Sequence, residues 1–220
     1  MNALARRAAG LLLGTLCLPL AAFAADVQPT HEFILDNGLK VVVREDHRAP
    51  VVVSQIWYKV GSSYETPGQT GLSHALEHMM FKGSAKIGPG EASRILRDLG
   101  AEENAFTSDD YTAYYQVLAR DRLPVALELE ADRLASLRLP ADEFSREIEV
   151  IKEERRLRTD DQPNAKAFEL FRAMAYPARR HHHPPTGSTA ALERPKVDAP
   201  RPWSASWSPP HNATLVAVGP

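Results

Sequence analysis

Two histidines and one glutamate lie close together in the run His74-Ala75-Leu76-Glu77-His78. In an α-helix successive side chains are about 100° apart, so His74 and His78 share one face and Glu77 lies beside them. Imidazole nitrogens bind zinc, and a catalytic zinc site leaves one coordination position open for water. A carboxylate beside the metal, such as that of Glu77, is the type of group that takes a proton from this water. The run therefore indicates a metal site with Glu77 as the general base.

The residues around this run favour a buried helix over about 73–81. Gly68 and Gly71 indicate a loop before it, and Ser73 is a candidate N-cap. Apolar residues recur at helical spacing and would bury one side of the helix. They are Leu72, Leu76, Met79 and Met80. The alternative is a helix whose histidines are merely hydrogen-bonded and whose Glu77 is solvated.

A third metal ligand is available on a second predicted helix, residues 141–158. This segment begins with acidic residues and ends with basic ones, which suits the helix dipole. Glu147 and Glu154 are seven residues apart and therefore lie on one face, two turns apart. Glu149 and Glu153 are competing carboxylates, and any glutamate on such a charged helix can be a surface group. The residue pattern alone does not choose Glu154 over Glu153.

The remaining chain predicts an α+β protein. Apolar residues alternate on both sides of Asp36-Asn37-Gly38, which predicts a hairpin over 31–45. The other expected strands are 51–60, 104–107, 111–118 and 213–218, and the other expected helices are 91–99, 123–137 and 164–174. Strands come first and helices follow in blocks, which favours α+β over an alternating parallel sheet.

The stretch after Pro177 is rich in proline, with nine of the seventeen prolines between Pro177 and Pro220. Proline breaks helix interiors, so we expect irregular chain up to the apolar strand at 213–218. His181-His182-His183 lie in this stretch. Adjacent residues do not share a helix or strand face, which favours an exposed loop over a metal site.

The N-terminus has the features of a secretory signal peptide, residues 1–24. Arg6 and Arg7 precede an apolar stretch, and Ala22-Phe23-Ala24 offers small residues for cleavage after Ala24. We therefore expect an exported protein, periplasmic or secreted, with no membrane span once the signal is removed. A membrane anchor, or lipid attachment through Cys17, is the alternative.

Composition limits the chemistry further. Cys17 is the only cysteine, so the mature chain would have no disulfides and no cysteine ligands, which leaves histidine and carboxylate. The formal net charge of -2 gives no sign of a nucleic-acid partner.

Beyond the five-residue motif, the chain resembles the pitrilysin-type inverted zincins. This family includes the mitochondrial processing peptidases and small bacterial relatives, and His-x-x-Glu-His is the inverzincin motif. The similarity runs over about 33–174 and is densest at 71–83. It continues in 104–108, 110–112, 127–133 and 150–154.

The resemblance implies one zinc ion per chain, with His74, His78 and Glu154 as ligands and Glu77 as the base. Glu147 would support the site through hydrogen bonds. The implied fold is a mixed, largely antiparallel sheet packed by helices on one side.

The resemblance also places a substrate peptide along an edge strand at Asn104, Ala105 and Phe106. Main-chain pairing there would give affinity with little sequence preference, and Asn104 would hold a substrate carbonyl. The alternative for Asn104 is a residue that only starts the strand or a turn.

We interpret 25–176 as the N-terminal domain of a zinc peptidase, and 177–220 as a proline-rich irregular region with the last strand of the same domain. Family members are usually about twice as long, and a second homologous domain or subunit closes over the first. The expected function is a zinc-dependent endopeptidase acting on peptides or unfolded segments. The alternative is a non-catalytic, zinc-binding, peptide-holding half that needs such a partner. In the relatives a helix spans 192–207, where this chain has Pro195, Pro200 and Pro202.

Overall fold

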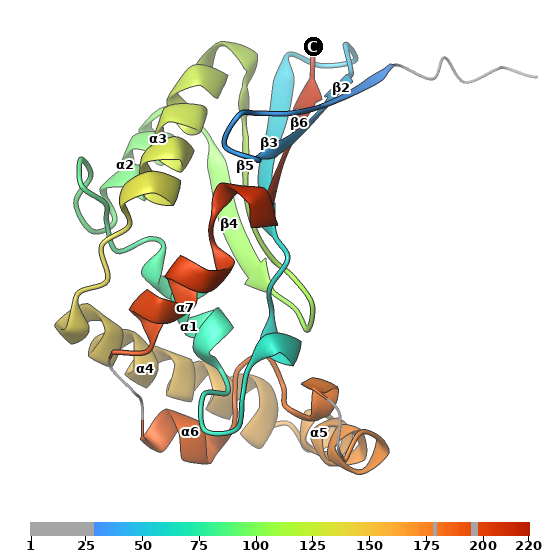
Figure 1. The fold of residues 1–220 in the computed structure, drawn as a ribbon, viewed down its shortest axis with the longest axis vertical. Helices are drawn as coiled ribbons and strands as arrows, with labels where there is room; N and C mark the ends of the chain where they lie inside the picture. Colours follow the sequence, from blue (N-terminus) through green and yellow to red (C-terminus); the bar gives the residue numbers. More distant parts are fainter. Residues whose placement is uncertain (1–28, 178–179, 195–197) are drawn as a thin grey trace, which may run out of the picture.

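A six-stranded sheet forms one side of the molecule in the computed structural model, which describes residues 29–177, 180–194 and 198–220 (Figure 1). Its strand order is β1-β2-β6-β3-β5-β4. The strands are β1 Thr30–Ile34, β2 Lys40–Glu45, β3 Val51–Tyr58, β4 Glu102–Thr107, β5 Thr112–Ala119 and β6 Ala213–Gly219. β2 and β6 are parallel, and the other neighbouring strands are antiparallel. The sheet is therefore mixed and largely antiparallel, as predicted.

The helices cover one face of this sheet (Figure 1). They are α1 Leu72–Met79, α2 Glu91–Asp98, α3 Leu123–Ser136, α4 Ala141–Arg155, α5 Pro163–Ala175, α6 Thr189–Glu193 and α7 Pro200–Trp207. In β3 the residues Val52, Ser54 and Ile56 are buried, and those between them are only half-buried. This alternation is what a strand shows when a single face is packed against helices. The α+β class with one-sided helices is confirmed.

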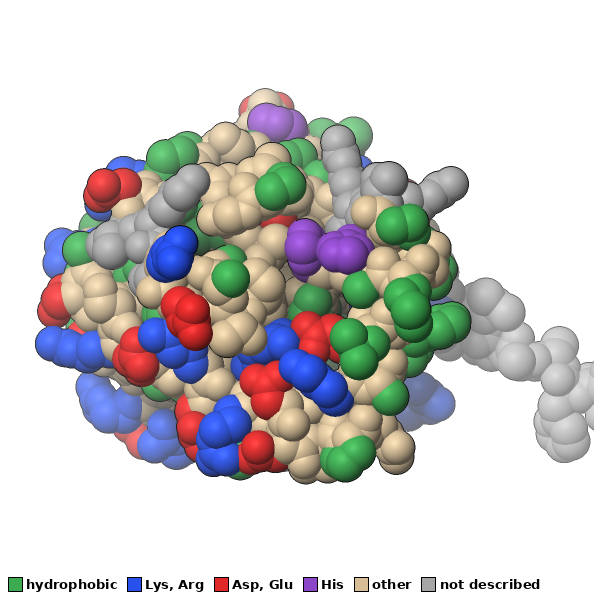
Figure 2. Space-filling view, turned by 90° about the horizontal axis from the view of Figure 1, so that it is seen from below, with side chains coloured by type: hydrophobic (Ala, Val, Ile, Leu, Met, Phe, Trp, Pro, Cys, Tyr) green, Lys and Arg blue, Asp and Glu red, His purple; other side chains and the backbone are tan. Residues whose placement is uncertain are grey.

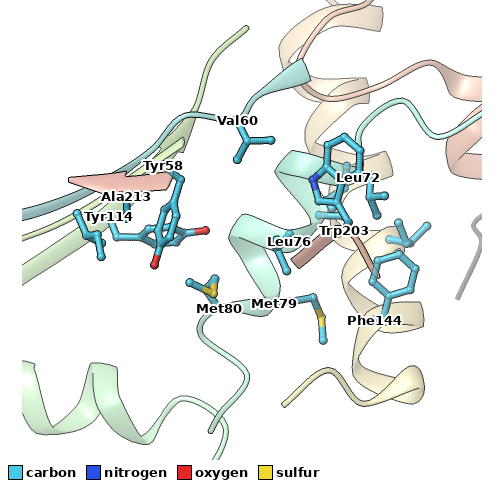
Figure 3. Close-up of a cluster of buried hydrophobic side chains, with 14 of the residues drawn as sticks. Tyr58, Val60, Leu72, Leu76, Met79, Met80, Tyr114, Phe144, Trp203 and Ala213 are labelled. Carbon is cyan, nitrogen blue, oxygen red and sulfur yellow. The ribbon is translucent and has the colours of Figure 1, made fainter. Parts of the chain in front are cut away.

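α1 lies in the middle of the main hydrophobic core, with side chains of the sheet on one side and of α4 and α7 on the other (Figure 3). Met79 of α1 and Ile151 of α4 are fully buried. Tyr58, Phe144 and Trp203 complete the core around them. A helix of eight residues is marginal by itself. Its position is therefore set by tertiary packing, in which each fully buried large side chain contributes about 1.5–3 kcal/mol.

The N-terminus of α1 is capped differently from the prediction. Gly71, not Ser73, is the N-cap residue, with φ of 89°. Its backbone passes Thr186 so closely that a side-chain carbon would lie 2.9 Å from the Thr186 carbonyl oxygen. The buried Glu65 carboxylate accepts hydrogen bonds from the N–H groups of Gly71 and Ser73, both at 2.7 Å. Burial raises the pKa of Glu65 to about 7, although these hydrogen bonds act to lower it.

The proline-rich stretch contains two short helices, which corrects the expectation of irregular chain before β6. Pro200 lies in the first turn of α7, where a missing N–H costs no helical hydrogen bond. Trp203 of α7 then packs into the core. Ser188 caps α6 by accepting a hydrogen bond from the Ala191 N–H. Pro195 lies outside the described residues.

The predicted helix 141–158 changes its type near its end. It is α-helical to Arg155 and continues as a π-helix, Arg156–Asp160. The predicted signal peptide lies outside the described residues. Within the described part of the chain, no helix has both the length and the apolar character needed to cross a membrane.

Candidate metal centre

His74, His78 and Glu154 come together where α1 packs against α4. The Oε2 atom of Glu154 lies 3.6 Å from Nε2 of His74 and 3.5 Å from Nε2 of His78. One ligand atom from each residue lies within 4.8 Å of the others. Tetrahedral zinc with bonds of about 2.0–2.1 Å holds neighbouring ligand atoms about 3.3–3.4 Å apart. Two imidazoles and a carboxylate at this spacing therefore fit a zinc ion.

The pKa shifts of His74 and Glu154 suit metal binding. Burial lowers the pKa of His74 to about 4, which keeps its ring neutral and able to bind a cation. Burial acts to lower the pKa of His78, but the carboxylates of Glu154 and Glu147 raise it above its ordinary value. The neighbouring ring of His78 lowers the pKa of Glu154, against the effect of burial, so this carboxylate is charged. Glu153, its neighbour, is exposed and pairs with Arg156.

Glu147 orients the second histidine. Its Oε2 atom lies 3.0 Å from Nδ1 of His78. A carboxylate only accepts hydrogen bonds, so Nδ1 carries the proton and Nε2 keeps a lone pair toward Glu154. Glu147 is the buried glutamate of α4, since the other four glutamates of this helix are half-buried or exposed. It lies where the resemblance implies, beside a candidate ligand.

Glu77 is buried on α1 between the two histidines in sequence. Burial raises the pKa of its carboxyl above the ordinary value, against a hydrogen bond from Thr107. Thr107 Oγ1 donates to Glu77 Oε2 at 2.5 Å. Sequence reasoning did not assign Thr107 a role, although it directly follows Phe106 in the motif at 104–108.

The predicted peptide-binding residues lie on β4, which is an edge strand. Ala105 packs against the core, whereas Asn104 and Phe106 are exposed. The amide oxygen of Asn104 accepts a hydrogen bond from the Ala105 N–H at 2.8 Å. The Phe106 ring meets Trp57 edge-on, with ring centroids 5.6 Å apart. The strand is available for pairing, but these three side chains do not all face the metal ligands.

The His181-His182-His183 run lies apart from these residues and is half-buried, with a 3-10 turn at Arg180–His182, which corrects the expectation of an exposed loop. His181 lies 3.4 Å from a carboxylate oxygen of Asp110. In the described part of the chain, the group of three metal-ligand side chains that converges is His74, His78 and Glu154. The run does not join it.

Comparison with known protein families matches residues 40–184 to the insulinase family, peptidase family M16. The chain belongs to peptidase family M16. This M16 chain is 36% identical over 193 residues to the zinc protease PqqE of Helicobacter pylori, covering 87% of the chain and 44% of that protein. It is 32% identical over 142 residues to the mitochondrial-processing peptidase subunit beta of Lentinula edodes, covering 64% of the chain and 30% of that protein.

Solved structures agree with this assignment. A crystal structure of a protease from Helicobacter pylori superposes with a TM-score of 0.85 at 33% identity, covering 88% of the M16 chain and 47% of that protein. A peptidase M16 inactive domain from Pseudomonas fluorescens has the same fold, with a TM-score of 0.79 at 18% identity, covering 87% of the chain and 46% of that domain. The chain spans less than half the length of these relatives. The family resemblance seen in the sequence is confirmed.

Proposed function

We propose that this chain carries the zinc site and the general base of an endopeptidase. The observation that carries the proposal is the convergence, at zinc spacing, of two imidazoles of α1 with one carboxylate of α4. The buried Glu77 lies on the same helix as the two histidines. His74, His78 and Glu154 would hold one zinc ion. When bound, zinc supplies a Lewis acid that polarises a peptide carbonyl and lowers the pKa of water.

Glu77 is proposed to move the proton. Its carboxylate takes a proton from the water that attacks the peptide carbonyl and passes it to the leaving amine as the C–N bond breaks. The raised pKa of this buried carboxyl brings it closer to the working pH, where it can both accept and release a proton. Thr107 holds Oε2, which leaves Oε1 for the water.

The substrate class we infer is an extended peptide or an unfolded segment. β4 lies at the edge of the sheet, and its last residue, Thr107, contacts Glu77. A peptide pairing with Asn104, Ala105 and Phe106 through its main chain would therefore run toward the base. A folded domain cannot offer such a free strand without unfolding locally.

The second candidate function is a peptide-holding half that needs a partner for cleavage. Its support is the length of the relatives and the surface of α5. Four large apolar side chains of α5 have exposed fractions between 58% and 74%. They are Phe168, Leu170, Phe171 and Met174. Figure 2, which views the molecule from below, shows hydrophobic side chains gathered on the side where α5 lies.

The charged residues of α5 do not interrupt this surface, because they pair within the chain. Lys166 pairs with Asp160, Glu169 with Arg155, and Arg172 with Asp109. An apolar surface of this kind is typical of a protein–protein contact. We infer that a second homologous domain or subunit covers it and completes the active site.

Export is the third part of the proposal. The features of residues 1–24 support a cleaved signal peptide, and a protein of the same fold, PqqL of Escherichia coli, is a periplasmic protease. We infer a periplasmic or secreted protein whose N-terminus is Ala25. Mass spectrometry of the protein from its native host tests this, and an uncleaved N-terminus would contradict it.

The deciding experiment compares Glu77→Gln with the wild type in zinc analysis and in a fluorogenic peptide assay. We expect one zinc per chain in both proteins, and a loss of cleavage of about a hundredfold or more in the variant, because proton transfer contributes about 10²–10⁴-fold. Glu149→Gln, on the exposed side of α4, is the control and should cleave normally. Unchanged turnover in Glu77→Gln would remove Glu77 from the role. Zinc binding without cleavage by the wild type would favour the peptide-holding function.

A further inference from the structure

Lys82 lies three residues beyond the end of α1 and contacts the carboxylate that orients His78. Its Nζ atom is 2.5 Å from Oε1 of Glu147, whose Oε2 lies 3.0 Å from Nδ1 of His78. The exposed side-chain fractions of Lys82, His78 and Glu147 are 27%, 20% and 10%. An ammonium, a carboxylate and an imidazole therefore form one chain of contacts, and the free nitrogen of the imidazole faces Glu154.

Each oxygen of Glu147 has a different donor in this chain of contacts. The terminal torsion of a glutamate is soft, so one hydrogen bond alone does not fix the plane of its carboxylate. A second donor, bonded to the other oxygen, fixes that plane. Lys82 itself is held by the turn that ends α1, because its N–H donates to the Met79 carbonyl at 3.0 Å. The ammonium thus approaches Glu147 from the same turn of chain that carries His78.

We propose that Lys82 is a positioning residue for His78: its ammonium holds the Glu147 carboxylate in the plane that accepts the Nδ1 proton and leaves Nε2 directed at the metal. This inference rests on the proposed function, in which His78 is a zinc ligand. The charge of Lys82 also offsets the cost of burying the Glu147 carboxylate beside a neutral ring. A lysine that only joined α1 to α4 would affect folding stability and leave the ring of His78 unchanged.

The test replaces Lys82 by Met, which keeps the length of the stem and removes the charge, and by Arg, which keeps the charge. Zinc affinity is measured by competition with a chromophoric chelator, and the tautomer of His78 by ring ¹H–¹⁵N NMR of the zinc-free protein. We expect Lys82→Met to weaken zinc binding about 10–100-fold, the usual effect of losing a group that supports a ligand. The His78 signal should change from the Nδ1–H tautomer to a mixture of the Nδ1–H and Nε2–H tautomers. Lys82→Arg should restore most of the zinc affinity and most of the Nδ1–H signal.

Lys86→Met is the matched control. Lys86 is four residues further along, its side chain is 68% exposed, and its contact with Glu128 is 4.0 Å long. It should behave as the wild type in both measurements. If Lys82→Met does not fold, Lys82→Gln repeats the comparison, since it keeps a donor without the charge.

Unchanged zinc affinity and an unchanged His78 spectrum in folded Lys82→Met would overturn the inference. The NMR measurement needs no zinc, so it separates this inference from the proposed function. A wild type that binds no zinc would contradict the proposed function, whereas a His78 tautomer that depends on Lys82 would still support the contact described here.

Discussion

Glu154 and Arg155 are consecutive residues of α4, but their side chains enter two ionic clusters with different spacing. Arg155 donates to the Gly187 carbonyl and to Glu169, both at 2.8 Å, and its side chain is 4% exposed. Glu154 Oε2 instead lies 3.5 Å and 3.6 Å from two imidazole nitrogens. The first distances are those of good hydrogen bonds, and the second are longer than such bonds prefer. The distance between the charged atoms, more than their burial, therefore distinguishes a cluster that stabilises the fold from one suited to a cation.

The π-helix that follows these residues serves both clusters. The Asp161 N–H donates to the Arg156 carbonyl at 2.8 Å, a five-residue step that widens the turn. Within this wide turn, Asp160 lies 3.5 Å from Arg155 and Arg158 lies 2.6 Å from Glu154. A wide turn next to a candidate ligand is a common feature of functional sites.

The largest effect is expected at the cluster suited to a cation. Glu154→Gln keeps the size of the side chain and removes the charge of one of three ligands. We expect zinc affinity to fall about a thousandfold or more, since each ligand carries a large share of the binding free energy. Chelator competition measures this. Glu153→Gln is the control, because Glu153 points to Arg156, and zinc binding that is lost equally in both variants would contradict the assignment.

A smaller effect, on folding instead of metal binding, is expected at the neighbouring cluster. Arg155→Met would remove the donor that bonds both Glu169 and the Gly187 carbonyl, and we expect the free energy of unfolding to fall by about 3 kcal/mol. Urea denaturation measures this. Arg156→Met removes an exposed arginine and should change stability little. If Arg155→Met keeps full stability, its cluster does not hold the fold.

Glu65 makes a second contact that stabilises the fold, through its hydrogen bonds to the N-terminus of α1. Its contribution to the free energy of unfolding depends on pH. The folded-state pKa of about 7 exceeds the ordinary value of 4.5, so the folded protein binds the extra proton. Stability should therefore fall as pH rises from about 4.5 to about 7, by up to about 3 kcal/mol. Chemical denaturation at several pH values measures this.

Glu65→Gln isolates the contribution of this one group, because the glutamine does not titrate. The wild type should lose stability relative to the variant across the same pH window. Parallel curves for the two proteins would show that Glu65 does not titrate there.

The sequence by itself determined the features of this protein that depend on the helical repeat and on the local conformational preferences of its residues. The helical repeat puts His74, Glu77 and His78 on one side of a short helix, whatever surrounds it. The turn at Gly38, with φ of 86°, and the strands beside it follow equally from local residue preference. Family resemblance then named Glu154, where the pattern alone left Glu153 open.

Only the tertiary structure decided which groups from distant parts of the chain meet. The burial of Ile151 in the same core as Met79 sets the rotation of α4, which turns Glu154 toward α1 and Glu153 toward solvent. The hydrogen bonds of Glu65 to the N-terminus of α1 and the contact of Lys82 with Glu147 could not be predicted for the same reason. Periodicity describes which face a residue occupies on its own helix or strand. It carries no information about which other element that face will meet, because that choice is made by the burial of the whole core.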